Sequence, residues 1–231
     1  MEVLVRPDRK AAVALTASLI EAQIARKPDS VLGLATGRTM EAVYDRLARQ
    51  PSAFRDITTF NLDEYVGLPA SDPRSYAHYM RVHLFDRVEI DPANAHLPDG
   101  MADDLIVEAE SYERRIADAG GIDLQLLGIG ETGHIGFNEP SSSLRSRTRD
   151  KLLAPGTRAQ NAAFFGGDPD AVPARALTMG VGTILDARTL VLLACGADKA
   201  EIVAAAVEGP VTASVSASAI QFHNACVVVL D

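Results

Sequence analysis

Residues 31–48, VLGLATGRTMEAVYDRLA, contain one complete strand-to-helix unit. Val31–Ala35 is a short apolar run of the kind that forms a buried strand. Met40–Ala48 carries apolar residues at spacings of three and four, which is typical of a helix. A polar turn, ATGRT at 35–39, joins the two. We therefore expect strand-turn-helix units to build this fold.

The same alternation recurs along the chain. Apolar, β-branched runs predict further strands at Val3–Val5, Ile57–Leu62, Ile122–Leu127, Thr189–Ala194 and Ala225–Leu230, and helical spacing predicts helices at Ala11–Ile24, Ala102–Asp118 and Ala200–Val207. Such alternation favours an α/β fold with a doubly wound, mostly parallel Rossmann-like sheet and helices on both faces. We expect residues 1–231 to form a single domain. Residues 154–174, rich in Gly, Pro and Asp, predict an irregular segment that acts as a lid over a site.

Composition excludes several classes of protein. The 231 residues are 47% hydrophobic and 23% charged, with a formal net charge of −9. A folded core is expected, and no basic stripe is present to hold nucleic acid or an anionic membrane. No stretch reaches the ~18 apolar residues of a membrane span and no export signal is evident, so a cytoplasmic protein is predicted. Cys195 and Cys226 lie in apolar runs and are expected to be buried free thiols.

Four polar segments follow predicted strands, where ligands bind in open parallel sheets. They are ATGRT at 35–39, NLDEY at 61–65, GIGETGHIGFNEP at 128–140 and GADK at 196–199. Because the carboxyl ends of parallel strands share one edge of the sheet, we expect these segments to converge on one site. Any phosphate site must be built locally there, since the net charge of the chain repels anions.

Two of the segments suit an anion. Thr36, Gly37, Arg38 and Thr39 open a predicted helix, so their backbone N–H groups can face a phosphate, although an ordinary capped turn gives the same pattern. Lys199 begins another helix, where a cation opposes the helix dipole unless an anion lies between them. We favour phosphate contact over a solvated lysine.

The other two segments carry acid/base groups. Asp63 follows a strand and can act as a general base beside a carbonyl or imine carbon, while a surface or helix-capping role is the alternative for the Asp63–Glu64 pair. His134 lies in a glycine-rich loop five residues before Glu139, whose carboxylate can fix its tautomer. The other four histidines are expected to be structural. No Cys/His cluster has metal-ligand spacing, so no metal is expected.

These motifs together resemble the glucosamine-6-phosphate deaminase (isomerase) family. The resemblance runs through nearly the whole chain and rests on TFNLDEYVGLP at 59–69, the 128–140 segment, SSLRSRTR at 142–149, ALTMGVGTIL at 176–185 and AVEGPV at 206–211. The related 6-phosphogluconolactonases share the fold and the glycine-rich loop with its histidine. They lack the FNEP that stands here at 137–140.

The resemblance implies deamination of glucosamine 6-phosphate to fructose 6-phosphate and ammonia, without metal or organic cofactor. Asp63 would move the proton between C2 and C1, and His134, tuned by Glu139, would open the sugar ring. Thr36, Gly37, Arg38, Thr39 and Lys199 would surround the phosphate. The partner is a small-molecule amino-sugar phosphate, with no nucleic acid and no membrane. Family members range from monomers to hexamers, so a homo-oligomer is among the expected states.

This sequence departs from the family pattern at three positions. Thr132 stands where the best-known members carry an acidic residue, so Glu139 is the one acidic partner expected for His134. Thr132 is still counted with Asp63, His134 and Glu139 among the candidate catalytic residues. The family usually has an arginine before a Phe-Phe pair near the lid, where it helps to hold the phosphate, whereas this sequence reads NAAFF at 161–165 and lacks that cation. Arg38 stands where many members have Gly or Ser, and we expect it to replace the missing cation.

An activator site and other substrates also follow from the resemblance. Some members bind N-acetylglucosamine 6-phosphate at positions matching Ser142, Ser143, Arg149 and Lys151, with help from a C-terminal segment beyond the position of Asp231. The alternatives to the main interpretation are a deaminase of galactosamine 6-phosphate or another amino-sugar phosphate, a 6-phosphogluconolactonase, and a sugar-phosphate sensor without turnover.

Overall fold

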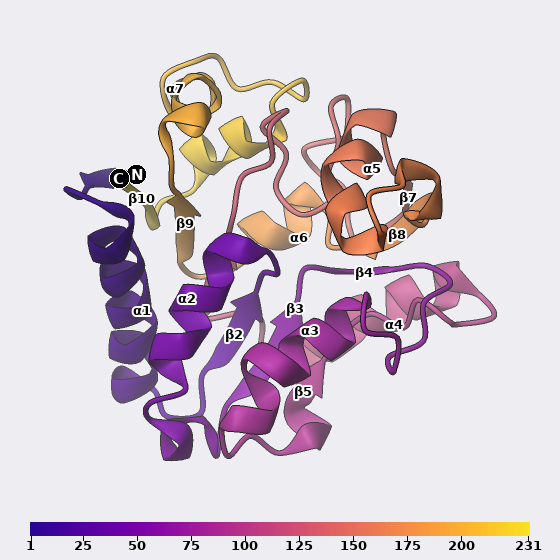
Figure 1. Cartoon of the computed structure of the whole chain (residues 1–231). Helices are drawn as coiled ribbons and strands as arrows, with labels where there is room; N and C mark the ends of the chain where they lie inside the picture. The colour runs from indigo at the N-terminus through magenta and orange to yellow at the C-terminus, as the bar shows by residue number, and fades with distance from the viewer.

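A seven-stranded, fully parallel sheet forms the centre of the protein in a computed structural model that describes residues 1–231. Its order is β1-β10-β9-β6-β2-β3-β5 (Figure 1). The strands are β1 Glu2–Val5, β2 Val31–Leu34, β3 Thr58–Asn61, β5 Ala95–His96, β6 Leu124–Leu127, β9 Leu190–Ala194 and β10 Cys226–Leu230. Strand β1 pairs with β10, which places the two chain ends next to each other.

Helices cover both faces of this sheet. The α-helices are α1 Arg9–Arg26, α2 Arg38–Leu47, α3 Tyr76–His83, α4 Leu105–Asp118, α5 Pro155–Asn161, α6 Val181–Leu185 and α7 Ala200–Val207. Helices α1, α2 and α3 lie on the near face in Figure 1, and α4 lies on the far face. This arrangement follows from right-handed crossovers, because the chain moves along the sheet one way from β2 to β5 and returns the other way to β6.

The predicted doubly wound α/β fold is confirmed. All six predicted strands and all four predicted helices are present, with ends that differ by up to three residues. Helix α4 begins at Leu105 rather than Ala102 because Asp104 caps it, its side chain accepting hydrogen bonds from the backbone N–H groups of Ile106 and Val107. Seven short 3-10 helices complete the secondary structure, at Pro51–Phe54, Phe85–Arg87, Pro92–Asn94, Ala162–Phe165, Pro169–Ala171, Ala197–Lys199 and Ser216–Phe222.

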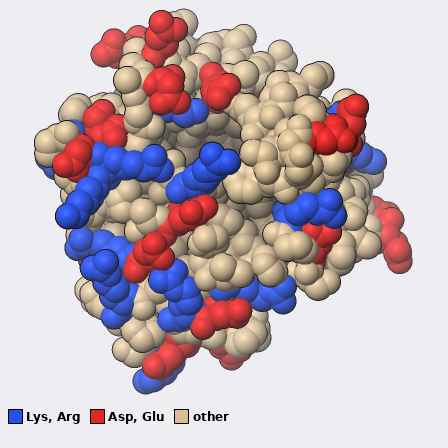
Figure 2. All heavy atoms as spheres, viewed as in Figure 1, with Lys and Arg blue, Asp and Glu red and all other residues tan.

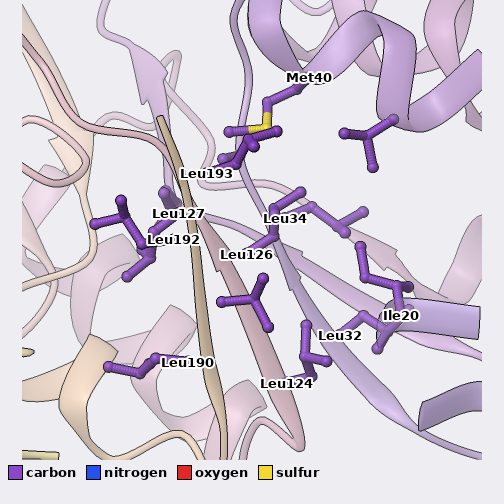
Figure 3. Close-up of a cluster of buried hydrophobic side chains, with 14 of the residues drawn as sticks. Ile20, Leu32, Leu34, Met40, Leu124, Leu126, Leu127, Leu190, Leu192 and Leu193 are labelled. Carbon is purple, nitrogen blue, oxygen red and sulfur yellow. The ribbon is translucent and has the colours of Figure 1, made fainter. Parts of the chain in front are cut away.

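The main hydrophobic core lies between the sheet and its helices and contains 42 buried residues. Figure 3 shows its centre, where leucines of β2, β6 and β9 meet Ile20 of α1 and Met40 of α2. Both faces of these strands are buried, so they are apolar at successive positions rather than alternating. Met40 also lines the cavity described below, so the hydrophobic core is in direct contact with the wall of that cavity.

A second, three-stranded sheet was not predicted. It contains β4 Asp63–Tyr65, β8 Arg175–Thr178 and β7 Arg149–Leu152, all antiparallel, in the order β4-β8-β7. A separate cluster of eight buried residues, including Tyr65, Phe137 and Phe165, packs beside it. The prediction of one domain over 1–231 stays a prediction.

The expectation of an irregular segment at 154–174 is wrong. Helix α5 and two 3-10 helices occupy most of it, and Figure 1 shows them stacked beside β7 and β8. The residues that suggested irregularity are the helix boundaries: Pro155 is at the first position of α5, Asp168 caps the last 3-10 helix, and Gly166 ends the middle one with φ of 72°. The segment lines the cavity, as a lid would, through Gln160, Asn161 and Phe164.

None of the helices combines the length and the hydropathy that a membrane span requires. Both cysteines are free thiols; Cys226 is buried, and Cys195 is half-buried at the cavity.

Candidate active site

A cavity of about 550 Å³ opens at the carboxyl ends of β9, β6, β2 and β3, which are consecutive neighbours in the sheet. All four polar segments named from the sequence contribute to its wall. Of the predicted site residues, the wall contains Thr36, Gly37, Arg38, Thr39, Asp63, His134 and Lys199. Figure 2 shows this face hollowed, with Lys and Arg side chains beside the hollow. The predicted convergence is therefore present in the structure.

Asp63 is a buried carboxylic acid in the cavity wall. Only 6% of its surface is exposed. Burial and the charge of Glu64 raise its pKa to about 8, while a hydrogen bond from the backbone of Phe137 acts in the opposite direction. A carboxyl group with a pKa near neutrality can both take and return a proton, as an acid/base residue must.

Glu64, the next residue of β4, points away from the cavity. Its Oε1 accepts hydrogen bonds from the backbone N–H groups of Tyr65 (2.7 Å) and Tyr76 (3.0 Å), and its Oε2 accepts one from Ala77 (2.8 Å). Tyr76 and Ala77 open helix α3. The two carboxylates thus divide the roles that the sequence left open: Asp63 faces the cavity and Glu64 caps a helix.

His134 lies in the cavity wall, in a loop where its ring packs against Gly130. A Cβ atom on Gly130 would lie 2.1 Å from Nε2 of His134, so only glycine leaves room for the imidazole ring there. Burial is the largest effect on the pKa of His134 and lowers it. The charges of Glu139 and Glu131 raise this pKa, the charge of Lys199 lowers it, and the net shift is downward. Burial therefore favours the neutral imidazole, which can accept a proton.

Two side chains approach the same ring nitrogen of His134. Oγ1 of Thr132 lies 2.9 Å from Nδ1, within hydrogen-bond distance, whereas Oε2 of Glu139 lies 3.7 Å away. Oε2 is buried and has no hydrogen-bond partner, while Oε1 accepts a bond from the backbone N–H of Ala154 at 3.1 Å. Thr132, one of the predicted catalytic residues, thus lies within hydrogen-bond distance of His134.

Another part of the cavity wall is suited to an anion. Gly37 has φ of 120°, and α2 starts after it with no side chain capping its first N–H groups. Arg38 is exposed, and its guanidinium lies 5.2 Å from the centre of the Phe164 ring in the lid segment. Lys199 is half-buried at the start of α7. Backbone N–H groups and two cations therefore face the same space.

Several cavity residues were not singled out from the sequence. Arg9 comes from the start of α1, Glu131 and Asp198 add carboxylates, and Tyr76 adds a half-buried side chain whose hydroxyl donates a hydrogen bond to that of Tyr65. Tyr76 has no sequence signal of its own, since its position depends on the bond between its backbone and Glu64. No group of three or more His, Cys, Asp and Glu side chains is arranged as a metal-binding cluster.

The chain matches known proteins along its whole length. Residues 9–229 match the family model described as glucosamine-6-phosphate isomerases/6-phosphogluconolactonase. Glucosamine-6-phosphate deaminases of Shewanella loihica and Mycolicibacterium smegmatis are each 51% identical to all of this chain, which covers 87% and 90% of their lengths. The chain belongs to the glucosamine-6-phosphate isomerase/6-phosphogluconolactonase family.

Solved structures of the family divide into two levels of similarity. The structure of a monomeric glucosamine-6-phosphate deaminase superimposes with a TM-score of 0.97 at 42% identity, covering 100% of this chain and 97% of that one. The 6-phosphogluconolactonase of Trypanosoma cruzi superimposes with a TM-score of 0.81 at 19% identity, over 100% and 94% of the two chains. The second similarity shows a shared fold only.

The residues predicted for an activator site lie outside the cavity of this family member. Arg149 and Lys151 are half-buried on β7, Ser143 is exposed, and Ser142 is buried with its hydroxyl unpaired. Burial lowers the pKa of Arg149. The assignment of an activator to these residues stays a prediction.

Proposed function

We propose that the protein is a glucosamine-6-phosphate deaminase, which converts glucosamine 6-phosphate and water to fructose 6-phosphate and ammonia. One observation carries the proposal: the buried carboxyl group of Asp63, with its pKa raised to about 8, lies in the same cavity as His134 and the cations Arg38 and Lys199. Hydrolysis of a lactone needs no base at a carbon atom, whereas moving a proton between two carbons does. The deaminases at 51% identity support the same activity.

Ring opening is the proposed task of His134. Its neutral imidazole takes the proton of the C1 hydroxyl and gives a proton to the ring oxygen, so the C1–O5 bond breaks and an aldehyde forms. Thr132 and Glu139 hold the ring from the Nδ1 side, at 2.9 Å and 3.7 Å. With Nδ1 engaged there, Nε2 is the nitrogen that exchanges protons with the sugar.

Isomerisation is the proposed task of Asp63. The carboxylate removes the proton from C2, the electron pair forms the C1–C2 double bond, and the aldehyde oxygen takes up a proton. The nitrogen loses the extra proton of its ammonium form to water, and return of the proton from Asp63 to C1 then leaves a C=N bond at C2. Water adds to this carbon and ammonia departs, which completes fructose 6-phosphate without any net oxidation.

The phosphate is proposed to bind at the start of α2. Thr36, Gly37, Arg38 and Thr39 surround it there, and Lys199, at the start of α7, neutralises part of its charge. The distance between this end and Asp63 then fixes which carbon atoms meet the carboxylate. The substrate is a small molecule, and no nucleic acid or membrane takes part. A cytoplasmic location belongs to the same proposal, which is compatible with a monomer and with a homo-oligomer.

Release of ammonia and fructose 6-phosphate from the purified protein tests the function. Glucosamine 6-phosphate and galactosamine 6-phosphate are compared as substrates, with 6-phosphogluconolactone as the control for the hydrolase alternative. Ammonia from glucosamine 6-phosphate, and its near absence in Asp63→Asn, is expected. Lactone hydrolysis without ammonia release would contradict the proposal, and binding of the sugar phosphates without turnover would indicate a sensor.

A further inference from the structure

Arg9 is a cation in the cavity wall whose role the chemistry above leaves open. It is the first residue of α1, it is exposed, and it forms neither an ion pair nor a hydrogen bond through its side chain. It reaches the cavity from the β1 side of the sheet, beside Cys195 at the end of β9. Burial and Asp231 raise the pKa of Cys195, and the charge of Arg9 acts against them, so that charge is felt inside the cavity.

Three cations at the starts of three helices line this one cavity. Arg9 opens α1, Arg38 opens α2 and Lys199 immediately precedes α7. Each stands where the helix dipole disfavours positive charge, and none is ion-paired within the protein. Repulsion among these unpaired cations and the positive ends of the helix dipoles both disfavour this concentration of positive charge, and an anion bound between the cations relieves both effects.

The acidic residues of the cavity do not neutralise these cations by direct contact. Asp63 is assigned to proton transfer at the carbon atoms of the sugar. Glu131 is exposed and acts on His134, and Asp198 is exposed with Oδ1 close to Gly196. A phosphate monoester carries close to two negative charges at neutral pH and offers three acceptor oxygens, so it can engage more than one guanidinium.

We propose that Arg9 is a phosphate-binding residue that determines specificity for phosphorylated sugars. Its guanidinium contacts the phosphate from the β1 side, opposite the turn that carries Arg38. This inference rests on the proposed function for the identity of the sugar, but the binding of phosphate to Arg9 does not depend on turnover. Arginine suits this position because its planar donors pair with phosphate oxygens two at a time.

The test compares Arg9→Gln and Arg9→Lys with Lys10→Gln. Lys10 is the adjacent exposed cation of α1 and does not line the cavity, so its variant has the same change in net charge. Two quantities are measured: the KM for glucosamine 6-phosphate, and the Kd of inorganic phosphate by calorimetry without substrate. In Arg9→Gln both are expected to rise by about tenfold with kcat nearly unchanged, with smaller rises in Arg9→Lys and none in Lys10→Gln.

Equal effects in Arg9→Gln and Lys10→Gln, or no effect in either, would overturn the assignment. Thermal unfolding of each variant confirms that the fold is intact. If the wild-type protein releases no ammonia, the proposed function fails, and the calorimetric Kd still decides whether Arg9 binds phosphate.

Discussion

Oγ1 of Thr132 lies 2.9 Å from Nδ1 of His134, closer than the carboxylate of Glu139 at 3.7 Å. A neutral hydroxyl thus makes the hydrogen bond to the imidazole. Compared with a carboxylate at this position, a hydroxyl gives less stabilisation to the imidazolium. The pKa of His134, which burial already lowers, is left low enough for the ring to act as a base near neutral pH.

Thr132→Val and Thr132→Asp separate hydrogen bonding from charge. Loss of one neutral hydrogen bond, worth about 1 kcal/mol, predicts a kcat/KM roughly fivefold lower in Thr132→Val. Thr132→Asp adds a negative charge, which raises the pKa of His134. The part of the acid side of the kcat/KM profile that comes from His134 should therefore move to higher pH. Thr132→Ser retains the hydroxyl and should behave like the wild type. A profile that stays in place in Thr132→Asp would exclude Thr132 as a partner of His134.

The pH dependence of kcat/KM reports Asp63 in the free enzyme. Since the carboxylate must be ionised to remove the C2 proton, and its pKa is raised to about 8, kcat/KM should increase with pH and level off above about 8. The bound amino group is a cation, which favours the carboxylate, so kcat should level off at a lower pH than kcat/KM. Initial rates between pH 6 and 9.5 measure both profiles. Profiles that are flat over this range would contradict the assignment.

Asp63 should also reduce the stability of the fold at neutral pH. Its pKa is near 3.9 in the unfolded chain and about 8 in the folded one, so between these values only the folded state binds the proton. Stability arising from this group therefore decreases as pH rises from 4 to 8 and is constant above. Asp63→Asn removes the effect, so its Tm should exceed that of the wild type increasingly up to about pH 8. A gain of about 1 kcal/mol corresponds to roughly 2–4 °C.

The stability comparison needs a control for general charge removal. Asp118→Asn alters an exposed carboxyl group at the end of α4 and should leave the pH dependence of Tm unchanged. If Asp63→Asn follows the wild-type Tm at every pH, the carboxyl group is not destabilised by burial.

The main sheet could be predicted because its strands are buried on both faces. Each of the runs Val31–Leu34, Leu124–Leu127 and Leu190–Ala194 is a stretch of buried residues, mostly apolar, and the helices between them keep a clear period. The second sheet gives no such signal. Strand β7 reads RDKL and β4 reads DEY, and both are strands because of antiparallel pairing with β8, more than 20 residues away along the chain. Pairing over that separation leaves no periodic trace in a short polar sequence.

The part of the site that could be predicted from the sequence consists of residues in polar loops that directly follow strands. The loops of Thr36, Asp63, His134 and Lys199 all reach one cavity. Arg9 was missed because the sequence around it reads as an ordinary capped helix start, with Asp8 as the N-cap. Its proximity to Cys195 depends on strand β1 closing the far edge of the sheet beside β10, which no local pattern reveals.

Arg38 is expected to hold the phosphate from the turn before α2. Replacing it by alanine removes charge-assisted hydrogen bonds worth about 1.5–3 kcal/mol, so the KM for glucosamine 6-phosphate should increase roughly tenfold or more with kcat less affected. Arg38→Lys should lose less. Phe164→Leu removes the ring under the guanidinium and tests whether the lid segment orients it. An unchanged KM in Arg38→Ala would show that Arg38 does not replace the expected lid cation.

Glu64 connects the position of Asp63 to the start of helix α3. Its two oxygens accept three backbone hydrogen bonds, and its negative charge is the second cause of the raised pKa of Asp63. Stability and catalysis should therefore respond to Glu64 in different ways, although the side chain lies outside the cavity wall.

Glu64→Gln should lower the Tm and move the acid side of the kcat/KM profile to lower pH. The amide NH2 cannot accept a hydrogen bond, so at least one backbone N–H of Tyr65, Tyr76 or Ala77 loses its partner, at a cost of roughly 1.5–3 kcal/mol, or about 3–12 °C in Tm. Without the neighbouring charge, Asp63 ionises more readily and its pKa falls. Glu110→Gln, an exposed change on α4, should alter neither quantity. A lower Tm with an unmoved profile would mean that Glu64 only anchors α3 and does not tune Asp63.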